Sequence, residues 1–240
     1  KNYRRWGTIT CAGNVLVGTA GWTPHSHTIF AFDLDSGKLK WTQRGSGITH
    51  ISVTITDSAV FYLTGDVDEK QHQEALATRA EMVGKGSYIE GVERDFPPAK
   101  MDVRMGILRD LEDGEIIWRK PLDLTDCGPR LPNWRKGAGG AQWPFVGTAY
   151  ADGLLAFYGH FGNHDAHVFD WNKPRQTERR VTVVSAMDGE MVWSRPFHYL
   201  QKPIIVGDKI IVLPRVCELR TGEIVTRDHP VSGQRVPLEV

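Results

Sequence analysis

The sequence is short of cysteine. Cys11, Cys127 and Cys217 are the only three in 240 residues, and no two of them form a C-x-x-C pair. This scarcity excludes a disulfide-dense scaffold, a zinc ribbon and a C-x-x-C-H haem site within the chain. Because free cysteine is among the most buried residue types, we expect three isolated, buried thiols.

The sequence also lacks an excess of charge of either sign. It has 29 basic and 29 acidic residues, and basic stretches such as Arg4-Arg5 and Arg135-Lys136 are only two residues long. A protein that binds nucleic acid or an anionic membrane surface normally carries a basic excess or a basic stripe. The composition therefore argues against both kinds of partner.

Long apolar runs are absent as well. A membrane-spanning helix needs roughly 20 apolar residues, whereas the longest candidates here are strand-sized: Leu154–Tyr158, Ile204–Val206 and Ile210–Leu213. We therefore expect no membrane span in this segment. The chain begins with Lys1 and not with Met, so we expect its true N-terminus to be missing, and the lack of a visible signal peptide excludes nothing.

What the sequence does contain is an internal repeat, together with eight Trp and 25 Gly. In each copy a β-rich segment runs into a polar residue and Gly, and a second β-rich segment follows, with Trp four residues after the Gly in three copies. Gly allows the positive φ that a tight hairpin needs, and the Trp would fill the space between neighbouring sheets. The copies are Ala31–Trp41, Leu108–Trp118, Val183–Trp193 and the degraded Val216–Thr226.

A second hairpin precedes each of these hairpins. Ile51–Ile55, for example, alternates apolar and polar residues, turns at Thr56–Ser58 and returns as Val60–Leu63. Two hairpins make four antiparallel strands, which is one blade of a β-propeller. The sequence therefore predicts an all-β chain with four blades, near residues 6–43, 48–120, 143–195 and 202–227.

Two insertions interrupt the predicted blades, at 66–102 and 160–178, and we expect both to project from the sheets. Within the first, Glu69–Val83 is rich in Glu, Gln, Ala and Met and predicts a short helix. A linker, Cys127–Gln142, joins the second and third blades. Because connecting segments carry most functional residues, these loops are where we expect a ligand or partner to bind.

The pattern Ala-x-Asp-x-x-Ser/Thr-Gly-Lys-x-x-Trp resembles the repeat of the pyrroloquinoline-quinone (PQQ) β-propellers, the quinoprotein alcohol dehydrogenase-like and BamB-like family. Ala31–Trp41 matches it almost fully, the second copy keeps its Asp, Gly and Trp, and the third has Ser185 in place of Asp. The resemblance implies that the repeated Asp and Trp tie one blade to the next, a role carried onto Asp33, Asp110, Trp41, Trp118 and Trp193. It also implies an extracytoplasmic location, in the periplasm or cell envelope.

Members of this family commonly have seven or eight blades, so the resemblance implies that the four blades are part of a larger propeller. After the fourth blade we expect residues 228–233 to begin a loop without a further strand pair. In catalytic members PQQ lies on the propeller axis, stacked on a Trp and often on a disulfide between adjacent cysteines, with a calcium ion held by carboxylate and amide oxygens. PQQ with calcium therefore belongs, if anywhere, to the full-length parent.

This sequence has no Cys-Cys pair, and we nominate no catalytic, cofactor-binding or metal-binding residue. Trp134, Trp143 and Trp171 could stack a ring, but packing is the simpler interpretation. His160–His167, with Asp170 beyond, has ligands that suit zinc, yet Gly162 and Asn163 favour an exposed polar loop. Residues 136–140, Lys-Gly-Ala-Gly-Gly, lack the Lys-Ser/Thr of a P-loop.

Two function classes remain open. The first is a non-catalytic PQQ-like propeller that acts as a scaffold for a protein or small-molecule ligand on its loop face. Degenerate repeats, inserted loops and the lack of a catalytic motif favour it. The alternative is part of a PQQ-dependent quinoprotein dehydrogenase that oxidises alcohols or sugars. The sequence names neither a ligand nor a substrate.

Overall fold

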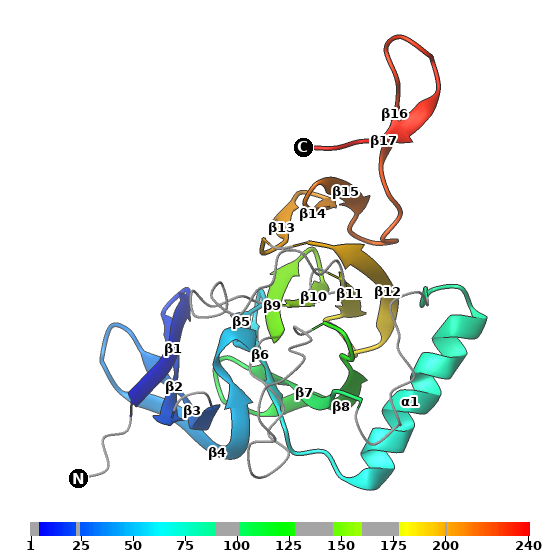
Figure 1. Cartoon of the computed structure of the whole chain (residues 1–240). Helices are drawn as coiled ribbons and strands as arrows, with labels where there is room; N and C mark the ends of the chain where they lie inside the picture. The colour runs from blue at the N-terminus through cyan, green and yellow to red at the C-terminus, as the bar shows by residue number, and fades with distance from the viewer. Residues whose placement is uncertain (1–4, 23–24, 90–100, 128–145, 160–177, 200) are drawn as a thin grey trace.

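The computed structural model describes residues 5–22, 25–89, 101–127, 146–159, 178–199 and 201–240. In this part of the chain the strands form four antiparallel sheets, which follow one another in sequence order along an arc, and a separate two-stranded hairpin (Figure 1). The described sheets do not close into a ring. One α-helix lies beside the second and third sheets.

Three of the sheets have four strands each, paired in simple sequence order. Their strands are short and separated by tight turns, as expected for propeller-like blades. Sheet A contains β1 (Arg5–Ala12), β2 (Val15–Trp22), β3 (His25–Asp33) and β4 (Leu39–Thr49). Sheet B contains β5 (Thr54–Ile55), β6 (Ala59–Thr64), β7 (Val103–Asp110) and β8 (Ile116–Asp123), after the short 3-10 turn His50–Ser52. Sheet C contains β9 (Val146–Ala151), β10 (Leu154–Gly159), β11 (Glu178–Ser185) and β12 (Met191–His198).

The fourth sheet departs from the predicted four-stranded blade. Sheet D has three strands, β13 (Ile204–Val206), β14 (Lys209–Val212) and β15 (Arg215–Glu218). The place of the outer strand is taken by two short pieces. Ile224 pairs with Cys217, as the outer strands do in the other sheets, but Glu239 then pairs with Arg215.

A hairpin therefore interrupts the outer strand of sheet D. The Leu238 N–H donates to the Val225 carbonyl at 2.7 Å, so the two pieces meet where the hairpin leaves. Between them, β16 (Thr226–Asp228) pairs with β17 (Arg235–Pro237) and extends away from the sheets (Figure 1). The expectation of a loop without a further strand pair was wrong. The sequence signal for a turn, Pro230 to Gly233, marked the tip of a hairpin and not the start of a loop.

Three hydrophobic cores lie between consecutive sheets. We call the face of a sheet that points to the preceding sheet its front, and the opposite face its back. Alternation along each strand sends neighbouring side chains to opposite faces, so Val17 on the back of sheet A packs in one core with Tyr62 on the front of sheet B. The same arrangement recurs between sheets B and C and between sheets C and D.

The repeated tryptophans cross these junctions as expected from the repeat. The indole N–H of Trp41 donates to the Leu111 carbonyl at 2.9 Å, that of Trp118 to Ala186 at 2.9 Å, and that of Trp193 to Leu219 at 2.8 Å. Each acceptor follows directly on the third strand of the next sheet. Trp41 and Trp193 are buried, whereas Trp118 is half-buried.

A glycine of the next turn packs against each of these indoles. Gly114, Gly189 and Gly222 have φ of +75°, +72° and +67°. A Cβ atom on Gly114 or Gly222 would lie 2.7 Å from the ring of Trp41 or Trp193, respectively. The glycine is therefore required twice, once for the turn and once for the close approach of the ring.

The repeated aspartates act within their own turns. Asp33 Oδ1 accepts hydrogen bonds from the Ser36 amide (2.8 Å) and hydroxyl (2.6 Å), and Asp110 Oδ1 accepts one from the Glu112 amide (2.7 Å). The Ser36 hydroxyl is the main reason that the pKa of Asp33 lies below its usual value. Of the two residue types expected to tie blades together, the described contacts assign this role to Trp.

Candidate functional site

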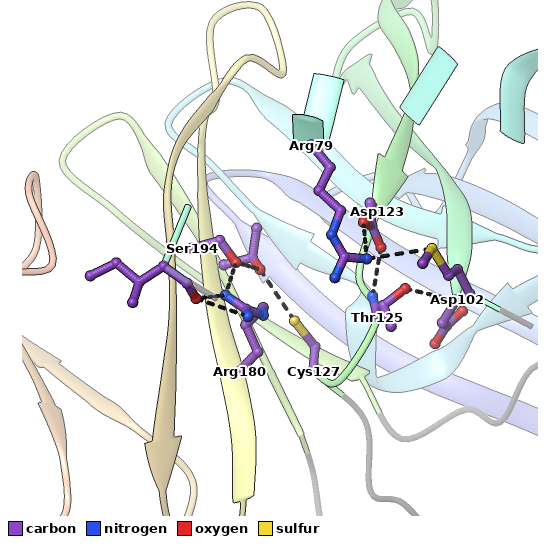
Figure 2. A network of polar contacts seen from close by, with 10 residues as sticks. Arg79, Asp102, Asp123, Thr125, Cys127, Arg180 and Ser194 are labelled. Carbon is purple, nitrogen blue, oxygen red and sulfur yellow. Dashed lines mark hydrogen bonds and ion pairs between the residues drawn. The ribbon is translucent and has the colours of Figure 1, made fainter. Parts of the chain in front are cut away.

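The long connections of the chain all leave from one edge of the sheets. Because antiparallel strands reverse at each turn, alternate connections lie on opposite edges. The β1–β2, β3–β4 and equivalent turns are tight and form one edge. The β6–β7, β8–β9 and β10–β11 connections form the other, which we call the loop face. The ends of these three connections meet at a network of buried polar side chains (Figure 2).

Helix α1 (Glu69–Gly84) provides one side of this network. Asp68 begins the helix with a capping box: its carboxylate accepts the Gln71 amide at 2.8 Å, and the Gln71 side chain accepts the Asp68 amide. Near the end of the helix, Arg79 Nη1 lies 3.2 Å from Asp123 Oδ2 at the end of β8. Burial raises the pKa of Asp123, and the guanidinium of Arg79 opposes that rise.

The chain after α1 joins sheet B to sheet C. The Ile89 amide donates to the Ser194 carbonyl, and the Ser194 amide donates to the Ser87 carbonyl, at 3.0 and 2.9 Å. Residues 87–89 thus extend sheet C beyond β12. The expected helix is confirmed, and residues 87–89 of the 66–102 insertion attach to sheet C instead of projecting from it. The polar composition of the insertion gave no sign of this attachment to sheet C, because the attachment is made by backbone hydrogen bonds.

Arg180 lies at the centre of the network and is fully buried. Both its Nη atoms donate to the Ile89 carbonyl at 3.0 Å, and Nη1 also donates to Ser194 Oγ at 3.3 Å. Its guanidinium stacks 4.0 Å from the centre of the Tyr88 ring, and its backbone amide donates to the Asp126 carbonyl. The Arg180 side chain therefore links the β6–β7 connection, at Ile89, to sheet C.

A second arginine–aspartate pair lies on the sheet B side of the network. Arg104 binds Asp102 through two nitrogens, at 2.9 and 2.8 Å, and Nη1 reaches Thr49 Oγ1 at 3.3 Å. The Asp102 amide donates to Thr125 Oγ1, and the Thr125 amide donates to Asp123 Oδ1. This chain of contacts fixes where β7 begins and where β8 ends.

The backbone is also tightly packed at Gly159, where the β10–β11 connection leaves β10. A Cβ atom on Gly159 would lie 2.4 Å from the Cys127 carbonyl oxygen, so no other residue fits there. The Gly159 amide donates to the Tyr199 hydroxyl at 2.8 Å, and Arg179 lies over the Tyr199 ring at 5.7 Å. Burial raises the pKa of the Tyr199 hydroxyl.

Cys127 is buried in the network, and its Sγ lies 3.4 Å from Thr182 Oγ1. Burial raises the pKa of its thiol to about 12, so it is a thiol and not a nucleophilic thiolate at neutral pH. Cys217 is buried too, but Cys11 is exposed on β1, which corrects the expectation of three buried thiols. The front face of sheet A, on which Cys11 lies, has no preceding sheet among the described residues.

Several residues singled out in the sequence lie outside the described part of the chain. These are the His160–His167 cluster with Asp170, the Lys136–Gly140 stretch, and Trp134, Trp143 and Trp171. Within the described residues, no three His, Cys, Asp or Glu side chains are grouped as metal ligands would be, and no helix has the length and apolarity to cross a membrane.

Sequence reasoning missed the arginine network. The one available signal was the pair Arg179-Arg180 at the start of β11, directly before the apolar residues of a buried strand. Four arginines (79, 104, 179 and 180) and three aspartates (102, 123 and 126) gather from elements far apart in the sequence. Buried guanidinium groups hold fixed geometry through several donors each, so the network suits the rigid positioning of loop ends.

Comparisons with known proteins give fold likenesses only. No protein-family model matches the chain, and no curated protein matches it. Among solved structures, a europium-containing methanol dehydrogenase is similar with a TM-score of 0.44 at 12% identity, over 96% of this chain and 44% of that one. A quinohemoprotein alcohol dehydrogenase from Pseudomonas putida HK5 gives 0.43 at 14%, over 95% and 36%, and BamB from Moraxella catarrhalis gives 0.33 at 12%, over 96% and 60%.

The chain thus spans less than two thirds of each of these three proteins. With TM-scores below 0.5, the likenesses carry no argument about activity or partners. The interpretation of the sheets as propeller blades rests on the repeats, the sheet order and the tryptophan contacts of this chain.

Proposed function

We propose that this chain is a non-catalytic, PQQ-like β-propeller segment that binds a protein or small-molecule ligand on its loop face. In this proposal sheets A to D are consecutive blades of a propeller that has seven or eight in all. The location we propose is extracytoplasmic, which follows from the family resemblance of the repeats alone.

The observation that carries the proposal is the position of the buried arginine network. The Arg180 side chain binds the Ile89 carbonyl and so holds this part of the β6–β7 connection against sheet C. Arg180 itself lies on β11, the strand that follows the segment 160–177. Cys127, at the start of a third long segment, packs against the β10–β11 root through Gly159. Binding proteins gain affinity when loops are positioned by a rigid base, because less conformational entropy is lost on binding.

Site-specific photo-crosslinking tests the loop face. A photoreactive amino acid would replace Ile89 or Lys202 at the loop edge, or Met187 or Ser36 at the opposite edge, in the cells that produce the protein. All four positions are exposed. We expect a discrete crosslinked species from the loop-edge positions and none from the two controls. Equal crosslinking from both edges would contradict the proposal.

A second measurement separates the scaffold from the dehydrogenase alternative. The purified full-length parent protein would be mixed with PQQ and calcium and assayed for a shifted quinone absorbance and for dye reduction with alcohols and sugars. The proposal expects neither signal. Substrate-dependent dye reduction would overturn it in favour of a quinoprotein dehydrogenase.

A further inference from the structure

The outer strands β4, β8 and β12 each have one edge of backbone groups that points away from their own sheet. We call these edges, together with that of sheet D, the rim. The rim is separate from the front and back faces, on which neighbouring sheets pack. Because an exposed edge strand can pair with a strand of another chain, proteins usually block such edges.

In sheet C a segment of the chain itself occupies the rim. The Ser194 N–H donates to the Ser87 carbonyl at 2.9 Å, and the Ser194 carbonyl accepts the Ile89 N–H at 3.0 Å. Tyr88 pairs with Ser194 in the parallel sense, so this segment adds a short strand to β12. The backbone groups of the residue that follows the repeated tryptophan therefore point outward.

A proline lies two residues further along the rim in sheets B and C. Backbone groups alternate in direction along a strand, so Pro196 occupies the next outward position of β12, and Pro121 occupies the equivalent position of β8. Proline has no N–H to donate to an added strand. Helix α1 also lies beside β8 (Figure 1), and the hairpin 226–237 interrupts the outer strand of sheet D. Three of the four edges are therefore obstructed.

The edge of sheet A has no such obstruction. Thr42 follows the repeated tryptophan as Ser194 does, and Arg44 takes the place of the two prolines. With 11 residues, β4 is the longest described strand. Within the described ranges, no strand or bridge pairs with its outer edge. The Arg44 carbonyl accepts the Nε2 amide of its neighbour Gln43 at 2.9 Å, a local contact that an added strand would replace.

We propose that the outer edge of β4 binds an extended segment of a partner protein, which carries acidic side chains and adds a fifth strand to sheet A. Strand addition of this kind gains affinity from backbone hydrogen bonds and specificity from side chains. Residues 38–49 contain three basic residues and no acidic one. Lys38 and Arg44 are exposed, whereas Lys40 is paired with Glu112 at 2.5 Å. Opposite charges on neighbouring strands stabilise their pairing, which favours an acidic segment.

The same charges argue against a second copy of this chain as the occupant. In a pair of β4 strands the basic side chains of one copy would face those of the other, and like charges on neighbouring strands are destabilising. Further blades would not fill the edge either, because blades pack on the faces of sheets, as the three cores show. The inference goes beyond the proposed function, since the rim is distinct from the loop face and either site can exist without the other.

Binding of a synthetic peptide to the full-length parent protein tests the inference. The probe is a fluorescent peptide of alternating Val and Glu. One control peptide has Lys in place of Glu, and the other has N-methyl groups along one backbone edge, which remove its hydrogen-bond donors. Fluorescence anisotropy should show saturable binding of the probe and at least tenfold weaker binding of both controls. Hydrogen exchange at residues 42 and 44 should slow when the probe binds.

Variants of the parent at Arg44 locate the site. Arg44→Pro gives sheet A the residue that sheets B and C already have, so it should keep its circular dichroism spectrum and bind the probe at least tenfold more weakly. Arg44→Glu should weaken the probe and strengthen the Lys peptide. The matched control Arg227→Glu, at an exposed residue of the hairpin, should bind as wild type does.

Four results would each overturn the inference. They are the absence of probe binding to wild type, equal binding of the N-methylated peptide, and binding that neither Arg44 variant changes. The fourth is slow exchange at residues 42 and 44 before the probe is added, because the parent would then cover this edge with its own chain.

Discussion

Tryptophan and glycine act as a pair at each junction between sheets. The indole of Trp193 donates to the Leu219 carbonyl, and Gly222 leaves room for the ring to reach it. Gly37 has the same positive φ of +66° at the same repeat position, but nothing lies within 4 Å of a Cβ atom built there. Substitution of Gly37 therefore measures the free-energy cost of the turn alone, whereas substitution of Gly222 adds the cost of the contact with the Trp193 ring.

Replacement of these glycines by alanine should reveal both costs. Gly37→Ala should lose about 1–2 kcal/mol, the penalty for a left-handed backbone at a residue with a Cβ. Gly222→Ala should lose roughly 1–3 kcal/mol more, because its Cβ would overpack the Trp193 ring. Urea unfolding of dilute protein measures the difference, and equal losses would contradict the role of Gly222 in the junction.

Cys127 shows how burial converts a reactive group into a structural one. Its pKa of about 12 in the folded protein compares with 9.0 for a free thiol. Between these values the unfolded chain has lost the thiol proton and the folded chain has kept it, so rising pH favours unfolding. The slope approaches about 1.4 kcal/mol per pH unit.

Cys127→Ala should remove this slope. We expect the free energy of unfolding of wild type to fall more steeply than that of Cys127→Ala between pH 9 and 10.5. Below pH 8 the difference between the two proteins should not vary with pH. Parallel profiles across the whole range would show that Cys127 ionises in the folded state.

At the scale of elements, the helix and the hairpin are additions that keep the sheets intact. Helix α1 enters the β6–β7 connection, and its Arg79–Asp123 pair is almost fully buried, with side chains 11% and 1% exposed. The Lys85–Glu81 pair of the same helix is exposed. Buried and exposed ion pairs respond differently to the loss of one partner.

Arg79→Met should destabilise the protein by about 3–5 kcal/mol, because Asp123 would keep a buried charge without its main counterion. Lys85→Met is the matched control and should change stability by less than about 1 kcal/mol. Thermal unfolding at neutral pH compares the two. Loss of the Arg79 charge should also raise the pKa of Asp123 further, so lowering the pH should restore part of the stability of Arg79→Met. Equal effects of the two substitutions would refute the buried pair.

The hairpin 226–237 should be removable without loss of the fold. Its two ends already meet through the hydrogen bond from Leu238 to Val225, so a direct join continues the outer strand of sheet D. We expect the deletion variant to keep its circular dichroism spectrum and to lose less than about 1 kcal/mol, since exposed loops tolerate shortening. A cooperative loss of structure would mean that the hairpin supports sheet D.

At the scale of the whole molecule, stability is organised as a row of junctions. Among the described residues, each sheet shares a core with its neighbours in sequence, so an unfolding event should spread from sheet to sheet, as in other repeat proteins. Residues 87–89, which bond to β12, add a second connection between sheets B and C. At the junction between C and D, Trp193 packs in the shared core and its indole donates to the Leu219 carbonyl.

Trp193→Ala should therefore release sheet D first. Loss of a buried aromatic costs about 3–5 kcal/mol, and Trp193→Phe should cost less because the ring stays. Hydrogen exchange should show lost protection in residues 204–218 with β2 and β3 still protected. Uniform loss of protection in all four sheets would show that the chain unfolds as one unit.

The sequence by itself determined the local structure of this protein. Alternating apolar residues, Gly at positive φ and the spaced tryptophans were enough to predict most strands of sheets A to D, their tight turns and the tryptophan contacts between sheets, and the composition of 69–83 predicted helix α1. These features depend on residues close in the chain or on a repeated position, so each copy supports the others.

Only the tertiary structure decided where the insertions lie. The attachment of residues 87–89 to β12 uses backbone groups, which have no residue signature, and in the arginine network Arg180 binds Ile89, 91 positions away in the chain. The break in the outer strand of sheet D likewise depends on Leu238 meeting Val225. Such contacts are chosen by the geometry of packed sheets, because burial requires every polar group near the loop face to find a partner wherever the fold provides one.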